Sequence, residues 1–201
     1  MVDVTLSEFR KSVAYRLTKP VARFLARTHI TPDAITWFGF LLTIGAAVLI
    51  ATEHLFAAGF LVLIASFFDA LDGALARYTN RVTRFGAVLD STLDRLSEAV
   101  LLIGILVLYA RAQSFAGILL VVVALVGSLL VSYIRARAEA LGLKCEVGLF
   151  TRPERVIILV LGLWLSQINY ALIIALAIIA ILSFITAGQR LVYVWQQTKT
   201  K

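Results

Sequence analysis

The sequence predicts an all-α integral membrane protein with six transmembrane helices, preceded by an amphipathic helix that lies in the membrane interface. Hydrophobic residues make up 61% of the 201 residues, charged residues make up only 15%, and the mean hydropathy is +0.93. Soluble domains contain about 45–50% apolar and about 25% charged residues, so an ordinary soluble domain is excluded. Long apolar stretches recur along the chain, and basic residues gather in alternate connections between them.

The first segment, about residues 3–28, differs from the stretches that follow. Apolar residues recur there at helical spacing and basic residues fill the positions between them. The apolar positions are Val4, Phe9, Val13, Leu17, Val21, Phe24 and Leu25, and the basic ones are Arg10, Lys11, Arg16, Lys19, Arg23 and Arg27. This pattern is typical of a helix that rests on an anionic lipid leaflet. We therefore assign residues 1–30 to a juxtamembrane amphipathic helix.

Six apolar segments follow, and a membrane span needs about 20 largely apolar residues. They cover approximately residues 34–51, 55–76, 85–109, 115–135, 154–167 and 170–189. The fifth segment has a short apolar run that starts after Pro153, a residue that favours the first turn of a helix. No linker of biased composition separates the segments, so we expect one six-helix domain over residues 31–195 and a short basic cytoplasmic tail at 196–201.

The placement of basic residues predicts the orientation of the chain. With six spans, nearly all of the 19 lysines and arginines fall on one side, whereas Arg111 lies in an opposite loop and Arg95 lies within a span. By the positive-inside rule that side is the cytoplasm, so both termini and the basic loops of this multi-pass plasma (inner) membrane protein are cytoplasmic. The net charge of +7 therefore faces lipid and substrate. No nucleic-acid partner is expected, because aromatic residues that could stack on bases are not interleaved with the basic ones.

Four aspartates interrupt the apolar sequence of the second and third predicted spans: Asp69, Asp72, Asp90 and Asp94. One ionised side chain near the middle of a bilayer costs about 2.5–3.5 kcal/mol, so four of them need a compensating charge. Spacings of three and four residues place each pair on one helix face, and two helices with a short connection can direct all four carboxylates at one another. Oxygen ligands select hard cations, and we predict two bound Mg²⁺ or Mn²⁺ ions near the cytoplasmic face.

Small residues and one arginine complete this pattern. Gly73, Ala76 and Gly86 leave the aspartate faces free of bulky side chains, and Arg77 offers a planar guanidinium to a phosphate. From Asp69 to Asp94 the chain reads Asp-x2-Asp-Gly-x2-Ala-Arg-x8-Gly-x3-Asp-x3-Asp. This pattern resembles the motif of the CDP-alcohol phosphotransferase family, and every fixed position of that motif is filled.

The resemblance implies an enzyme of phospholipid biosynthesis that transfers a phosphatidyl group from a CDP-lipid to an alcohol and releases CMP. It implies that Asp69, Asp72 and Asp90 bind metal, and that Asp94 contacts the second ion and acts as the general base. It also implies a homodimer. The residues expected to line the nucleotide are Asp69, Gly73, Ala76, Arg77 and Gly86, together with Thr31 and Pro32. Helix capping explains Thr31 and Pro32 equally well.

A second cluster bears on the acceptor. Arginines gather at the cytoplasmic ends of the last three predicted spans: Arg135, Arg137, Arg152, Arg155 and Arg190. Positive side chains beside a helix N-terminus form an anion site, which favours an acceptor that carries its own phosphate. Arginines that reach the membrane interface under the positive-inside rule are the alternative explanation.

Two segments of this cluster resemble one branch of the family. Tyr-Ile-Arg-Ala-Arg-Ala-Glu at 133–139 and Arg-Pro-Glu-Arg at 152–155 are similar to the branch that makes phosphatidylinositol phosphate from inositol phosphate in actinobacteria and, with archaeal lipid, in archaea. By this match the acceptor phosphate is bound by Arg137, Arg155 and Arg190, with Arg135 and Arg152 in the same cluster. A phosphorylated polyol is therefore the expected acceptor.

Alternatives remain open at this point. Glycerol 3-phosphate is also a phosphorylated acceptor in the family, which leaves a phosphatidylglycerophosphate synthase, and an ether-lipid donor would give an archaetidylinositol phosphate synthase. Glu98 continues the Asp90–Asp94 stripe and either supports the metal site or pairs with Arg95. An ion transporter would also place acids in a membrane. It is disfavoured because all four aspartates lie near one face and leave the other half apolar.

Overall fold

The computed structural model describes residues 18–28, 30–145 and 147–199, and within these residues the chain is helical with no strand. The helices are α2 (Pro32–Ala51), α3 (Leu55–Tyr78), α4 (Arg84–Arg111), α5 (Phe115–Ala140), α6 (Arg152–Trp164) and α7 (Ala171–Lys199), with a 3₁₀ turn, η1 (Leu165–Gln167), after α6. Residues 18–25 are helical as well. The predicted all-α class is confirmed.

Four of these helices, α2, α3, α5 and α7, are long and apolar enough to cross a membrane. The prediction of a membrane protein is thereby confirmed, while the predicted number of six spans stays a prediction. The first half of α4 carries acidic and basic side chains, and α6 is only 13 residues long.

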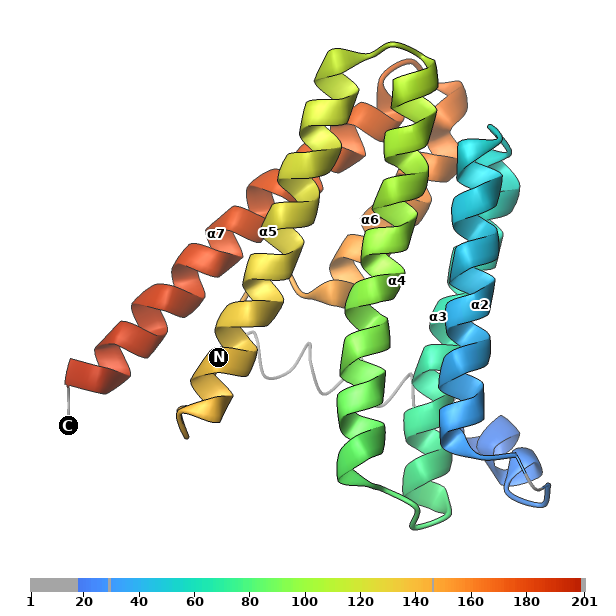
Figure 1. Cartoon of the computed structure of the whole chain (residues 1–201), viewed down its shortest axis with the longest axis vertical. Helices are drawn as coiled ribbons and strands as arrows, with labels where there is room; N and C mark the ends of the chain where they lie inside the picture. Colours follow the sequence, from blue (N-terminus) through green and yellow to red (C-terminus); the bar gives the residue numbers. More distant parts are fainter. Residues whose placement is uncertain (1–17, 29, 146, 200–201) are drawn as a thin grey trace.

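The helices form an antiparallel bundle (Figure 1). α2 packs along both α3 and α4, α5 packs along α7, and α6 packs against α3 and α7, whereas α3 and α4 have little direct backbone contact. The α3–α4 connection lies at one end of the bundle and the α4–α5 connection at the other. α2 holds α3 and α4 while their backbones stay apart, and a cavity lies between the start of α2, the end of α3 and the start of α4.

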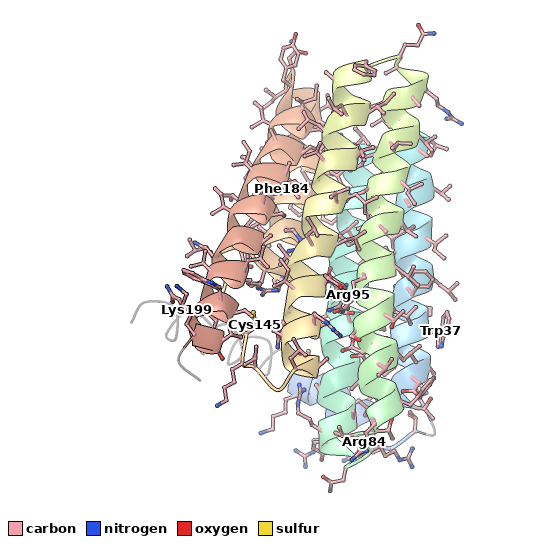
Figure 2. The ribbon with its side chains drawn as sticks, turned by 60° about the vertical axis from the view of Figure 1, so that its left-hand side comes forward. Trp37, Arg84, Arg95, Cys145, Phe184 and Lys199 are labelled. Atoms are coloured by element: carbon pink, nitrogen blue, oxygen red, sulfur yellow. The ribbon has the colours of Figure 1, made fainter. Side chains whose placement is uncertain are left out.

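Two apolar clusters hold the bundle together. The larger cluster contains residues from each of the helices α2 to α7, and includes the fully buried Ile50, Ile105 and Leu176. The smaller one lies where residues 18–25 pack against α2 and α3, and buries Ala22 and Leu75. On the outside, apolar side chains remain exposed, as expected for a surface that faces lipid. Trp37, for example, is 49% exposed and points away from α2 (Figure 2).

Within residues 18–28, some of the apolar side chains predicted for the N-terminal helix are packed against the bundle and one is exposed. Val21 and Leu25 pack against the smaller cluster, as their apolar spacing indicates, but Phe24 is 69% exposed. The position of this helix in the membrane interface stays a prediction, and residues 1–17 lie outside the described part of the chain.

Side-chain hydrogen bonds cap the first turns of α2, α4 and α6. The Thr31 hydroxyl accepts a hydrogen bond from the amide of Ala34 at 3.3 Å at the start of α2, and Thr83 accepts one from the amide of Gly86 at 2.8 Å at the start of α4. At α6, both the amide and the hydroxyl of Thr151 donate to Glu154, at 2.8 and 2.6 Å. Such caps satisfy groups that a helix end leaves unpaired.

Candidate active site

Helices α3 and α4 bring the predicted aspartates together. Oxygens of Asp69, Asp90 and Asp94 lie within 4.8 Å of one another, so three of the four carboxylates meet at one point. Asp72 lies one turn beyond Asp69 on α3, is only 4% exposed, and lines a cavity together with Asp90. The predicted convergence follows from the three- and four-residue spacings, which keep each pair on one helix face.

The carboxylate cluster fits a divalent metal ion. Like charges this close repel unless a cation lies between them. One oxygen of Asp72 is buried without a hydrogen-bond partner, which is unusual for a buried carboxylate and is relieved by a metal ion. Carboxylate oxygens are also the ligands that Mg²⁺ and Mn²⁺ prefer.

An arginine from α6 contacts the same carboxylates. Nη1 of Arg152 lies 2.6 Å from Oδ2 of Asp69 and 2.5 Å from Oδ1 of Asp94, and all three side chains are about a quarter exposed. The sequence predicted Arg152 as part of the acceptor cluster, and its contact with the aspartates was not foreseen. It supplies one of the positive charges that the four aspartates require.

A cavity of about 290 Å³ opens where the start of α2, the end of α3 and the start of α4 meet. Its lining includes five residues predicted to contact the nucleotide, namely Pro32, Gly73, Ala76, Arg77 and Gly86. Of the remaining two, Thr31 caps α2, and Asp69 lines a smaller neighbouring cavity. The cavity is therefore lined by the small residues that the motif predicted: Gly73, Ala76 and Gly86.

The cavity also contains residues that sequence reasoning left out: Asp33, Thr36, Arg81, Val82, Thr83 and Ala87. Thr36 lies one turn after Pro32 on α2, and helical spacing from Pro32 would have identified it. Arg81 belongs to the α3–α4 connection, where periodicity is lost and gives no signal. A side chain at Gly86 would place its Cβ 2.9 Å from the Thr83 hydroxyl, so glycine keeps this wall open.

Glu98 pairs with Arg155. Oε1 of Glu98 lies 2.5 Å from Nε of Arg155, and Oε2 lies 2.9 Å from Nη2, so the pair is bidentate. The alternative pairing of Glu98 with Arg95 is wrong, because the Arg95 guanidinium donates to the backbone carbonyl of Ser91. Arg155 is 3% exposed, which makes it one of the most buried charged groups in the described chain.

The other predicted acceptor arginines occupy different environments. Arg190 is 3% exposed and donates to the backbone carbonyls of Val147, at 2.9 Å, and Val131, at 2.6 Å. Arg135 pairs with Glu139 at the surface, at 2.8 Å, and Arg137 is exposed. Their role towards an acceptor stays a prediction.

The family model that matches the chain is CDP-alcohol phosphatidyltransferase, over residues 29–191. The chain belongs to the CDP-alcohol phosphatidyltransferase family. It is 40% identical over 196 residues to the archaetidylinositol phosphate synthase of Methanothermobacter thermautotrophicus, covering 96% of each protein. It is 43% identical over 189 residues to the phosphatidylinositol phosphate synthase of Mycobacterium marinum, covering 90% of this chain and 80% of the relative.

Solved structures extend the likeness to the fold. The crystal structure of the Mycobacterium tuberculosis phosphatidylinositol phosphate synthase with CDP-DAG bound has a TM-score of 0.83 and 39% identity, and the match covers 90% of this chain and 94% of that chain. The structure of that enzyme with manganese and citrate has a TM-score of 0.79 and 40% identity, over 89% and 88%.

As a CDP-alcohol phosphatidyltransferase, the chain is a transferase of phospholipid synthesis, as its motif predicted. The manganese in the relative's structure and the carboxylates of Asp69, Asp90 and Asp94 both indicate a divalent metal ion at this site. The site thus combines a carboxylate cluster with an adjacent cavity, between helices that belong to a membrane protein.

Proposed function

We propose that this protein transfers a phosphatidyl group from CDP-diacylglycerol to inositol phosphate, giving phosphatidylinositol phosphate and CMP. The observation that carries the proposal is the convergence of three motif aspartates beside a cavity lined by the small residues of the same motif. The names of the relatives support the reaction, as does the relative's structure with CDP-DAG.

Asp69, Asp72, Asp90 and Asp94 hold two ions, Mg²⁺ or Mn²⁺. Bound there, the ions polarise the donor pyrophosphate and stabilise the charge that develops on the departing CMP. The presence of a buried Asp72 oxygen without a protein partner supports this assignment.

The cavity between α2, α3 and α4 takes the nucleotide of the donor. Gly73, Ala76 and Gly86 let the cytidine diphosphate approach the helix backbones, and Arg77 contacts its phosphates. The lipid chains stay in the bilayer beside the bundle. Catalysis rests on positioning and charge neutralisation, as in other phosphoryl transfers.

Asp94 acts as the general base. It takes the proton of the acceptor hydroxyl while that oxygen forms a bond to the lipid-side phosphorus. The bond between this phosphorus and the oxygen shared with CMP breaks, and CMP leaves with the bonding electrons. In this structure Oδ1 of Asp94 contacts Arg152.

The acceptor phosphate binds to the arginine cluster of Arg137, Arg155 and Arg190, with Arg135 and Arg152 at its edge. Arg155 and Arg190 are almost fully buried, Arg155 lines a cavity together with Asp69, and buried positive charge favours an anionic partner. A second candidate function is archaetidylinositol phosphate synthesis with an ether-linked donor, favoured by the 40% identity to the Methanothermobacter thermautotrophicus enzyme. Glycerol 3-phosphate is the alternative acceptor.

The protein spans the plasma (inner) membrane six times as a homodimer, with both termini and the active site at the cytoplasmic face. Residues 1–30 form an interfacial helix, 31–195 the catalytic domain and 196–201 a basic tail. The alternating direction of α2 to α7 supports this topology. So does the position of Arg84 and Lys199 in the same half of the bundle (Figure 2).

The test is CMP release by protein purified in lipid nanodiscs with Mg²⁺ or Mn²⁺. CDP-diacylglycerol and its ether-linked archaeal counterpart are each combined with inositol phosphate, glycerol 3-phosphate, serine or inositol. We expect release with inositol phosphate. Asp94→Asn should be inactive while eluting as a folded protein. No release with any combination would exclude the proposal.

A further inference from the structure

Two acid–arginine pairs follow one another between α4 and α6. Glu98 lies one turn beyond Asp94 on α4, and Arg155 lies one turn beyond Arg152 on α6. Asp94 pairs with Arg152, and Glu98 pairs with Arg155. The backbones of these two helices make little direct contact, so the side chains themselves span the gap.

The second pair holds its arginine in one orientation. Glu98 binds Arg155 through Nε and Nη2, at 2.5 and 2.9 Å, and two parallel contacts of this kind fix the plane of a guanidinium. Nη1, away from this edge, donates a long hydrogen bond of 3.5 Å to the carbonyl of Phe150. Arg155 therefore keeps one edge with spare hydrogen-bonding capacity.

The Glu98–Arg155 pair lies beside the carboxylate site. Glu98 and Arg155 line the same small cavity, of about 30 Å³, as Asp69 and Arg152. The Glu98–Arg155 pair therefore borders the same space as Asp69 and Arg152.

We propose that Glu98 is a positioning residue for the acceptor phosphate: it holds Arg155 side-on so that the Nη1 edge faces the acceptor. The inference rests on the proposed function, in which Arg155 contacts that phosphate. A purely structural ion pair would affect folding stability and leave acceptor affinity unchanged, and this difference makes the two roles separable.

Steady-state CMP release tests the role with Glu98→Gln, which keeps the shape of the side chain and removes its charge. We expect the KM for inositol phosphate to rise between about tenfold and a hundredfold, because misplacing a group by about 1 Å has effects of this size. The kcat and the KM for the CDP-lipid should stay within about threefold. Glu98→Asp keeps the charge and should recover part of the affinity. The matched control, Glu53→Gln, changes an exposed carboxylate in the α2–α3 connection and should leave all constants unchanged.

A binding measurement makes the inference independent of turnover. Inositol phosphate alone, added without CDP-lipid, should raise the Tm of the wild type, and Glu98→Gln should lose this rise. Protection of the wild type without CMP release would exclude the proposed reaction and leave the role of Glu98 standing. An unprotected wild type, or a Glu98→Gln protein with a lower Tm but the same KM and the same protection, would overturn the inference. If Glu98→Gln does not fold, Glu98→Asp decides: a KM for inositol phosphate above the wild-type value supports the inference, and an unchanged KM overturns it.

Discussion

Arg152 is the residue on which the charge balance of the carboxylate cluster depends. Its Nη1 contacts both Asp69 and Asp94, whose oxygens are also predicted metal ligands. A guanidinium and a divalent cation cannot share two carboxylates without repulsion. Metal binding and the Arg152 contacts are therefore expected to compete.

Arg152→Gln should bind Mn²⁺ more tightly than the wild type, because the ion no longer displaces a guanidinium. We expect a decrease in Kd of about tenfold, equivalent to about 1.4 kcal/mol. Without metal, the same variant should have a lower Tm, since Asp69 and Asp94 lose their counter-ion. Electron paramagnetic resonance of free Mn²⁺ measures the affinity. Arg111→Gln, whose guanidinium donates to the carbonyl of Ala51, is the control, and weaker binding by Arg152→Gln would contradict the prediction.

How far the sequence predicts single residues depends on how local their contacts are. Three of the four aspartates, Asp69, Asp90 and Asp94, meet as predicted because their spacing places them on one face of each helix. Glu98 pairs with Arg155, 57 residues away, and Arg152 pairs with Asp69, 83 residues away. Which side chains meet across such separations depends on how deep in the bundle α6 begins. Periodicity within one helix carries no information on such contacts.

At the scale of helices, starts were predicted better than ends. The third predicted span begins at residue 85 and α4 at Arg84, because a threonine cap precedes the helix. By contrast, the last span was predicted to end at residue 189, and α7 continues to Lys199. Hydropathy reports where apolar residues stop, whereas a helix continues through polar residues that also favour it. The predicted tail at 196–201 thus begins within the last turn of α7.

The start of α4 forms one wall of the nucleotide cavity, and Gly86 limits how far this wall intrudes. Gly86→Val should raise the KM for the CDP-lipid by about tenfold, equivalent to about 1.4 kcal/mol, because Gly86 lines the cavity and the position of its Cβ is already close to the Thr83 hydroxyl. Gly188→Val is the matched control, since nothing lies within 4 Å of its Cβ position on α7. Steady-state kinetics with varied donor measures the effect. Equal constants for both variants would remove Gly86 from the donor site.

At the scale of the whole molecule, the site lies where helices that scarcely touch come together. Asp69 and Asp72 belong to α3, Asp90 and Asp94 to α4, and the backbones of these helices have little direct contact. A cation bound by both helices is therefore a link that the apolar packing does not provide. Composition predicts the membrane class of such a bundle, but not how far apart two of its helices stand.

Saturating Mn²⁺ or Mg²⁺ should consequently stabilise the protein as a whole. An ion at a hundred times its Kd adds about 2.7 kcal/mol to the free energy of unfolding, which corresponds to several degrees in the Tm of a chain of this size. Unfolding in nanodiscs, followed by tryptophan fluorescence, should show this rise, and excess chelator should abolish it. Asp90→Asn should lose most of the rise, and Glu139→Gln, at the surface of α5, should retain it. The same Tm with and without metal in the wild type would mean that the ions do not link α3 to α4.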